Sequence, residues 1–185
     1  DAWKPGVTCN ATGNATTLEI CRVLSQHCDE LERDIHVVFW NGHEVAEAAG
    51  STYFLDHHWD LLNKKCIAYM HIDSTGLLYA NKLEIKISDE LSRFARRNVA
   101  AIEDKDLRMM PLHKIGDQSF MGIGIPSVCQ RVSYTEEYLA TTHGATIGWW
   151  NHTKEDGVDK CDPDVLYQDT VIHTEFIYNL VNSKI

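Results

Sequence analysis

Residues 35–51, IHVVFWNGHEVAEAAGS, constrain the fold of this chain more than any other stretch. They open with a short run of β-branched and aromatic residues at 35–40, which is too short for a buried helix and suits a buried strand. An Asn-Gly turn signal follows, and the Glu, Val and Ala residues from 44 to about 58 predict a helix. His43 and Glu44 therefore stand where a strand gives way to a helix, and ligands bind at the carboxyl ends of strands in open α/β sheets.

The rest of the chain alternates helical patterns with short apolar strands. Strands are predicted at 66–72, 82–87 and 125–131, and the alternation of apolar and charged residues at 82–87 indicates an edge or half-exposed strand. Residues 102–115 are charged and irregular, and 136–160 are typical of a loop. Further helices are predicted at 14–26, at 89–99 and at 163–181. This order predicts an α/β class with a largely parallel sheet.

Length and composition narrow the class of protein. The 185 residues are enough for one domain with a sizeable core, and no stretch is apolar enough for a membrane span. The net charge of −10, from 17 basic and 27 acidic residues, argues against nucleic acid or an anionic membrane as a partner. Six cysteines without a CxxC motif favour reduced thiols and a cytoplasmic location, while three glycosylation sequons at 10, 14 and 151 keep secretion as an alternative.

Four groups with metal-binding chemistry follow apolar segments: Cys9, the pair His43-Glu44, Asp73 and His152. If the strands are neighbours, these groups converge on one rim of the sheet, and thiolate, carboxylate and imidazole are the usual zinc ligands. Each residue also has a purely structural interpretation. Glu44 suits the first turn of a helix, Asp73 suits a turn, Cys9 suits a small buried position, and His152 suits the surface.

The order and spacing of five segments resemble one enzyme family. These segments read DAWKPGVTCNATGNATTLEI, VVFWNGHEVAEAAGS, AYMHIDSTG, GDQSFMGIGIPSV and NHTKEDGVDKCD. They resemble, nearly end to end, the zinc-dependent exopeptidases that include bacterial leucine aminopeptidases, glutamate carboxypeptidase and the transferrin receptor. The resemblance implies a three-layer α/β sandwich with a mostly parallel, mixed central sheet flanked by helices. It covers only the later part of the catalytic domain, so residues 1–185 are expected to form a single, partial domain of this type.

The resemblance assigns metal-site roles by position. Asp1 matches the Asp of a His-x-Asp motif, which orients a metal-binding His that would lie two residues earlier. Cys9 falls at the position of a metal-bridging Asp, and His43 at the position of the general-base Glu. Glu44, Asp73 and His152 match metal ligands.

The resemblance also assigns a substrate pocket and a cofactor. Asp117, Phe120 and Ile125 fall in segments that wall the pocket of the family. One or two zinc ions are implied, with Glu44, His152 and Cys9 binding one ion and Asp73 helping to bind the second. Thiolate and imidazole at Cys9 and His43 are a departure from the carboxylates of the family, and they modify the expected site.

Two functions remain open at this stage. The first is a metal-dependent exopeptidase, an aminopeptidase or related amide hydrolase with a modified metal site, acting on a peptide or amide with a free terminus. The alternative is a non-catalytic family member that keeps the fold for binding or assembly, and a weaker one is redox or metal storage through Cys9. An incomplete sheet would expose an unpaired edge, so self-association, another chain or an absent N-terminal segment is expected to cover it.

Overall fold

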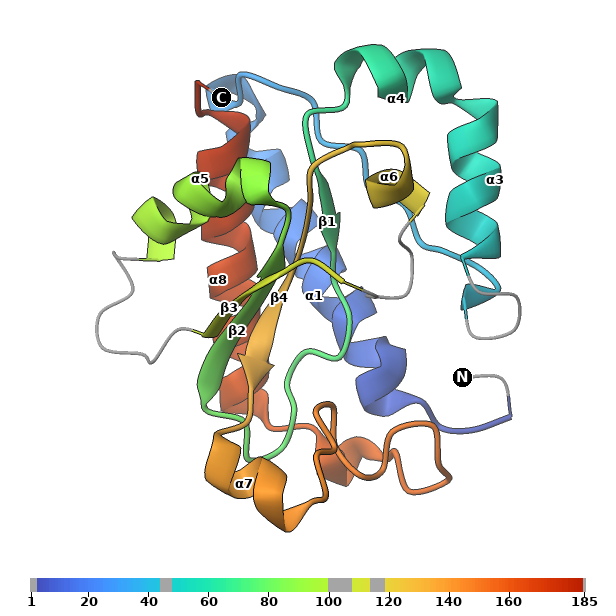
Figure 1. Ribbon diagram of the computed structural model, residues 1–185, viewed down its shortest axis with the longest axis vertical. Coiled ribbons are helices and arrows are strands. Elements are labelled where there is room, and N and C mark those ends of the chain that lie inside the picture. Colours follow the sequence, from blue (N-terminus) through green and yellow to red (C-terminus); the bar gives the residue numbers. More distant parts are fainter. Residues whose placement is uncertain (1–2, 44–47, 100–107, 114–118, 185) are drawn as a thin grey trace.

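The computed structural model describes residues 3–43, 48–99, 108–113 and 119–184 (Figure 1). Its helices are α1 (Thr12–Leu24), α3 (Ala49–His57), α4 (Trp59–Lys65), α5 (Asp89–Val99), α6 (Ser119–Gly122), α7 (Glu136–Thr141) and α8 (Pro163–Val181). Short helical turns are η1 (Val7–Ala11), η2 (Ser25–Glu30) and η3 (Val158–Lys160). The strands are β1 (Tyr69–His71), β2 (Lys82–Ile87), β3 (Arg108–Pro111) and β4 (Ser127–Ser133).

The four strands form one mixed sheet in the order β1-β4-β2-β3. β1 runs parallel to β4 with Met70 opposite Val128, and β2 runs parallel to β3. The central pair, β2 and β4, is antiparallel, with Ile85 opposite Gln130. Two of the three strand pairings are parallel, so the expected mixed α/β sheet is confirmed.

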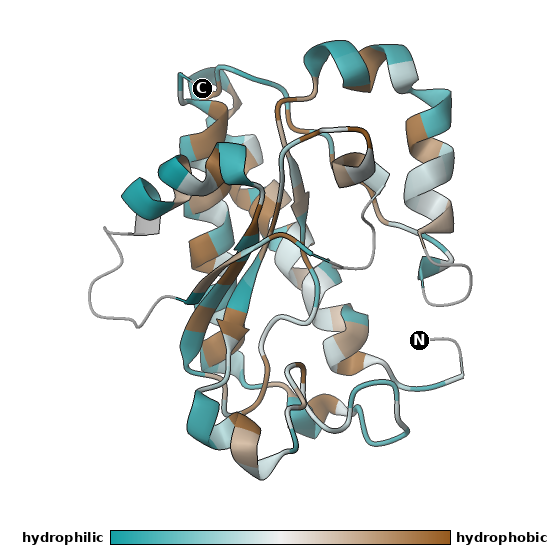
Figure 2. Cartoon of the chain, viewed as in Figure 1, coloured by the Kyte–Doolittle hydropathy of each residue, from teal (hydrophilic) through white to brown (hydrophobic). Residues whose placement is uncertain are grey.

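Helices cover both faces of this sheet and create two apolar cores. Met70 of β1 packs on the larger core, which also contains Leu83 and Ile85 of β2 and Phe176 of α8. Its neighbour Tyr69 packs on the smaller core, formed by α3, α4 and α6. Successive residues of a strand point to opposite faces, so these contacts define three layers. Figure 2 shows the apolar residues concentrated along the strands and on the sides of the helices that face them.

Local signals set the start of the long C-terminal helix. Asp162 precedes α8, and its carboxylate accepts hydrogen bonds from the backbone N–H groups of Asp164 and Val165. Pro163 occupies the first turn, where its missing N–H costs nothing. The predicted helix at 163–181 and the predicted helix at 89–99 are both confirmed.

The prediction of a strand at 35–40 is wrong. These residues are extended, but in the described part of the chain they pair with no strand, and Val37 and Phe39 are 42% and 51% exposed. An apolar run fixes an extended conformation locally, whereas a strand also requires a hydrogen-bonded neighbour. His43, just before the helix predicted from Glu44 to about 58, is helical. Later in that range the structure describes α3 from Ala49 to His57, which continues through a break at His58 into α4.

Two other expectations need correction. The strand β2 is interior rather than an edge, because it pairs with β3 on one side and β4 on the other. Its charged Glu84 is buried and forms ion pairs with Arg108 at 3.1 Å and Lys86 at 3.4 Å. The irregular 102–115 segment contains β3, which supplies that Arg108. The stretch 136–160, predicted to be mostly loop, begins with α7, which is capped by the Thr135 hydroxyl, and is otherwise largely turns and loop.

Candidate metal centre

Cys9 and His152 come together at one end of the molecule. Cys9 lies in η1, just before α1, and His152 lies in the loop between α7 and η3. The Cys9 Sγ and His152 Nε2 are 3.3 Å apart; the cysteine is 6% exposed and the histidine is open to solvent. His152 has a φ of 59°, a left-handed conformation that is uncommon for residues other than glycine. Two segments from opposite ends of the sequence therefore meet through a thiol and an imidazole.

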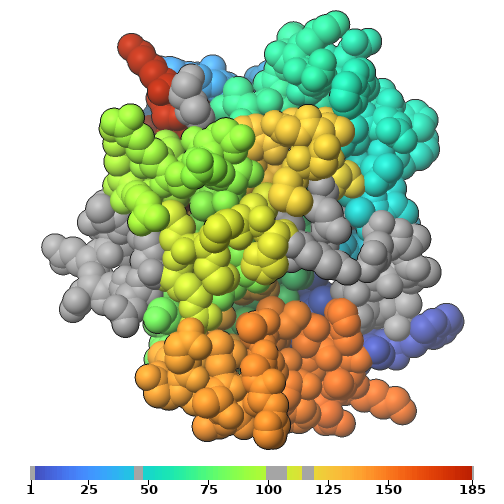
Figure 3. Space-filling view, viewed as in Figure 1, coloured from blue at the N-terminus to red at the C-terminus, as the bar shows by residue number. Residues whose placement is uncertain are grey.

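The buried carboxylate of Asp156 holds these two segments together. Its Oδ1 accepts hydrogen bonds from the Thr8 N–H at 2.9 Å and the Thr8 hydroxyl at 2.7 Å, and its Oδ2 accepts one from the Cys9 N–H at 3.1 Å. Trp150 is also buried, and its indole N–H donates to the Thr8 hydroxyl at 3.1 Å. Figure 3 shows the N-terminal segment in blue lying beside the orange segment that contains these residues. Sequence reasoning missed Asp156, because nothing local distinguishes it from its acidic neighbour Glu155.

Asp73 follows β1, as the sequence predicted. The Ser74 hydroxyl donates to its Oδ2 at 3.1 Å, and the Arg131 guanidinium lies 4.0 Å from the same oxygen and donates to the Asp73 carbonyl at 3.4 Å. Asn10 lies between Cys9 and this turn, and its amide is hydrogen-bonded to Ile72 and Ser74. The turn that carries Asp73 is therefore tied directly to the residue that follows Cys9.

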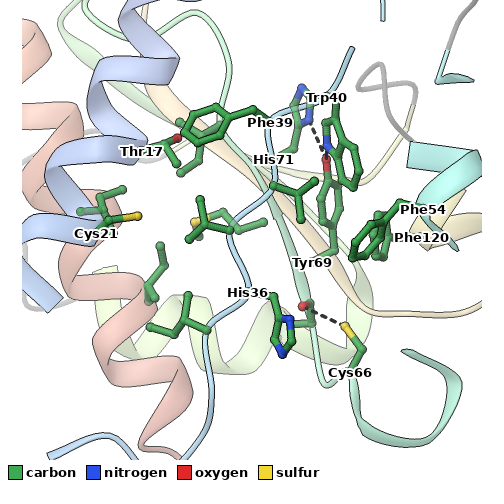
Figure 4. A pocket seen from close by; sticks show the side chains of 18 of the residues that line it. Thr17, Cys21, His36, Phe39, Trp40, Phe54, Cys66, Tyr69, His71 and Phe120 are labelled. Carbon is green, nitrogen blue, oxygen red and sulfur yellow. Dashed lines mark hydrogen bonds between the residues drawn. The ribbon is translucent and has the colours of Figure 1, made fainter. Parts of the chain in front are cut away.

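His43 lies beside a hydrogen-bonded group of aromatic residues on β1. Its ring centroid is 6.2 Å from that of His71. The Tyr69 hydroxyl is 3.0 Å from Nδ1 of His71 and accepts a hydrogen bond from the Trp40 indole N–H at 3.1 Å (Figure 4). Sequence reasoning missed His71, which is the last residue of β1 and lines the same cavity as Asp73.

A cavity of about 980 Å³ connects these groups. It lies between α1, the segment 31–43 and β1, and Cys9, His43 and Asp73 all line it. Figure 4 shows Thr17 and Cys21 of α1 on one side of this cavity and Tyr69, Trp40 and Phe120 on the other. The fold thus brings three of the predicted metal-site residues to one cavity, and His152 contacts it through Cys9.

The other predicted site residues divide into two groups. Phe120 lines the cavity and stacks on Tyr69 with ring centroids 4.3 Å apart, whereas Ile125 is buried in the smaller core. Asp1, Glu44 and Asp117 lie outside the described residues.

The donor atoms of Cys9 and His152 suit two corners of a tetrahedral zinc site. Zn–S and Zn–N bonds of about 2.3 and 2.0 Å at a tetrahedral angle would place the two donor atoms about 3.5 Å apart. The 3.3 Å between Cys9 Sγ and His152 Nε2 is close to this separation. Among the described residues, no group of three or more His, Cys, Asp and Glu side chains could hold an ion, and Glu44, the third predicted ligand, lies outside them.

Solved structures show the class of fold. The chain resembles BSAP, a zinc aminopeptidase from Bacillus subtilis, with a TM-score of 0.78 at 20% identity, over 100% of this chain and 45% of that one. It resembles LapB from Legionella pneumophila with a TM-score of 0.79 at 17% identity, over 99% of this chain and 49% of that one. It also resembles an aminopeptidase from an Aneurinibacillus strain with a TM-score of 0.72 at 18% identity, over 97% and 40%. The fold is that of zinc aminopeptidases, and the chain spans less than half the length of these three proteins.

The sequence identifies the family. The profile of Peptidase family M28 matches residues 1–174, and the chain belongs to this family. The resemblance read from the sequence is therefore confirmed. No curated protein matched the chain in a separate sequence comparison. Within the described ranges, every helix is too short or too polar to span a lipid bilayer.

Proposed function

We propose that this chain is the later part of the catalytic domain of a zinc-dependent exopeptidase with a modified metal site, and that residues 1–185 form one partial domain. The observation that carries the proposal is the contact between Cys9 and His152 at 3.3 Å, which joins two residues that the sequence resemblance predicts to be metal ligands. Cys9, His152 and Glu44 would hold one zinc ion. Asp73, which lines the same cavity as Cys9, would contribute to a second ion together with a histidine outside this sequence.

Each residue has a distinct chemical task in this proposal. Zinc, when bound, polarises a carbonyl and lowers the pKa of water to about 7. His43 faces the shared cavity, and its imidazole can accept a proton at neutral pH in the position of the family's general base. Asp1 would orient the histidine outside this sequence, and Asp117, Phe120 and Ile125 would wall the pocket. The substrate class is a peptide or amide with a free terminus.

A non-catalytic role is the alternative function. The family position for a bridging carboxylate holds Cys9, and the position for the general base holds His43. A protein that kept the fold for binding or assembly would tolerate both changes. The compact Cys9–His152–Asp156 arrangement favours the hydrolase, because a decayed site has no reason to keep a thiol and an imidazole in contact.

The open side of β1 supports a proposal about partners. Among the described residues β1 pairs with β4 alone, and the extended segment 35–40 faces it across the apolar cavity. We propose that a further strand, from a second copy or from a segment N-terminal to residue 1, covers this edge. Light scattering and amide hydrogen exchange on the full-length protein test the proposal. A monomer in which the amides of 69–71 exchange freely would contradict it.

A cytoplasmic location is also proposed. All six cysteines are free of disulfide bonds, and the Asn10 amide is engaged within the fold rather than available to a glycan. Fractionation of cells that express the protein tests the location, and recovery of a glycosylated form outside the cell would contradict it.

The activity is tested with the full-length protein and aminoacyl p-nitroanilides, each with a free or an acetylated amino group. We expect hydrolysis of the free amines, loss of activity after chelation and recovery with zinc. The Cys9→Asp variant restores the carboxylate of the family and should stay active, whereas His152→Ala should lose activity. A zinc-treated protein that hydrolyses neither free nor blocked substrates would contradict the hydrolase and favour a binding role.

A further inference from the structure

The side chain of Asn10 makes three hydrogen bonds in the most constrained part of the site. Its Nδ2 donates to the Ile72 carbonyl at 3.1 Å, and its Oδ1 accepts from the Ser74 N–H at 3.2 Å and the Gly13 N–H at 3.1 Å. The residue thus uses both halves of its amide, the donor and the acceptor.

The partners of Asn10 lie on either side of Asp73. Ile72 precedes this aspartate and Ser74 follows it, while Cys9 directly precedes Asn10. The backbone on both sides of Asp73 is therefore tied to the residue next to Cys9. Among the described residues, this is a direct side-chain link between the segment of Cys9 and the segment of Asp73.

Gly13, at the start of α1, leaves the space that the Asn10 amide occupies. A Cβ added to Gly13 would lie 2.1 Å from Asn10 Oδ1, which is far inside any real contact distance. Only a residue without a side chain at position 13 lets the Asn10 amide reach its partners, so Gly13 is explained by the packing of Asn10.

We propose that Asn10 is a positioning residue that fixes the separation between Cys9 and Asp73. The inference rests on the proposed function, because it concerns the distance between a ligand of the first ion and a ligand of the second. An amide is required at this position. A carboxylate would keep the acceptor that serves Gly13 and Ser74, but it would lose the donor and bring a negative charge against the Ile72 carbonyl.

The test compares Asn10→Asp with Asn63→Asp, the same change at an exposed position of α4 that does not line the cavity. Co²⁺ is titrated into the full-length protein, and the cobalt–thiolate and ligand-field bands report binding at Cys9. We expect Asn10→Asp to weaken cobalt binding about 10- to 100-fold and to change the bands, as loss of a ligand-orienting partner does. Asn63→Asp should leave both unchanged. The carboxylate of Asn10→Asp can still accept the hydrogen bond from the Gly13 N–H at the start of α1, so the expected loss does not come from this bond.

A second readout requires no metal. Hydrogen exchange of the Ser74 amide should accelerate about fivefold or more in Asn10→Asp, because the hydrogen bond to the Ile72 carbonyl, which helps to order this turn, is lost. If the unaltered protein binds no cobalt but Asn10→Asp still accelerates this exchange, the proposed metal site fails and the positioning role stands. Cobalt binding and exchange that are both unaltered in Asn10→Asp would overturn the positioning role.

Discussion

Cys9 and His152 are 143 positions apart in the sequence, yet their Sγ and Nε2 atoms lie 3.3 Å apart. The contact depends on Asp156, which belongs to the same loop as His152. Its carboxylate accepts hydrogen bonds from the backbone N–H groups of Thr8 and Cys9. The pair of Cys9 and His152 is the centre of our account, because the sequence resemblance predicts that both residues are metal ligands. The predictions below first test Asp156, which holds the two segments of the pair together. They then test two positions in the surrounding fold, and finally Cys9 and His152 themselves.

Asp156→Asn should destabilise the protein strongly. The carboxylate accepts three hydrogen bonds in a fully buried position, and an amide would turn a donor toward at least one of these donors. An unsatisfied buried group typically costs about 1–3 kcal/mol of unfolding free energy. Asp159→Asn is the matched control, because Asp159 is exposed and bonds its neighbour Lys160. Urea unfolding measures both variants, and equal midpoints would show that Asp156 does not hold these segments.

Gly76→Ala should cost more stability than Gly144→Ala. Both glycines have a positive φ, 69° and 81°, which an alanine adopts only with strain. A Cβ at position 76 would also lie 2.9 Å from the Leu166 Cβ on α8, whereas a Cβ at position 144 meets nothing within 4 Å. We expect an additional loss of about 1–3 kcal/mol for Gly76→Ala, the usual cost of overpacking. Thermal unfolding of the two variants measures this difference, and a difference near zero would refute the packing argument.

His173 should make the protein less stable in acid. Burial lowers the pKa of His173 to about 4 from its ordinary 6.5. Between these values the unfolded chain takes up a proton that the folded chain excludes, so the unfolding free energy falls as the pH decreases from about 6.5 to about 4. The loss from this residue is about 3 kcal/mol at the lower end.

The variant His173→Gln isolates this contribution. It removes the titrating group from the core, so its stability should depend less on pH over this window than that of the unaltered protein. His143→Gln, at an exposed histidine, is the control. Denaturant unfolding at a series of pH values gives the slopes. The same slope in His173→Gln and in the unaltered protein would mean that another group titrates.

The sequence predicts the elements whose signals are local. The cap at Asp162 and the apolar face that follows it identify α8, and the alternation at 82–87 identifies β2. The same alternation does not show that Glu84 is buried, because its partner Arg108 lies on another strand. Likewise, the apolar residues at 35–40 indicate an extended chain but not whether a strand lies beside it.

In the candidate site, too, the sequence does not reveal contacts between residues that are far apart in the chain. Cys9, Asp73 and His152 could be selected from their chemistry and the family resemblance, and the structure describes all three. Asp156 and Asn10 could not be selected, because their importance lies in contacts with backbone groups far away in the sequence. Predicting such residues requires the three-dimensional proximity that the sequence pattern lacks.

The most direct test of the account is the metal content of the full-length protein, purified without added metal and measured by mass spectrometry. Cys9→Ala and His152→Ala are measured beside it, with Cys28→Ala and His143→Ala as exposed controls. We predict near-stoichiometric zinc or another transition metal in the unaltered protein and in both controls, and its loss from the two site variants. Absence of bound metal from the unaltered protein, even after incubation with zinc, would contradict the account and leave a fold that is kept for binding.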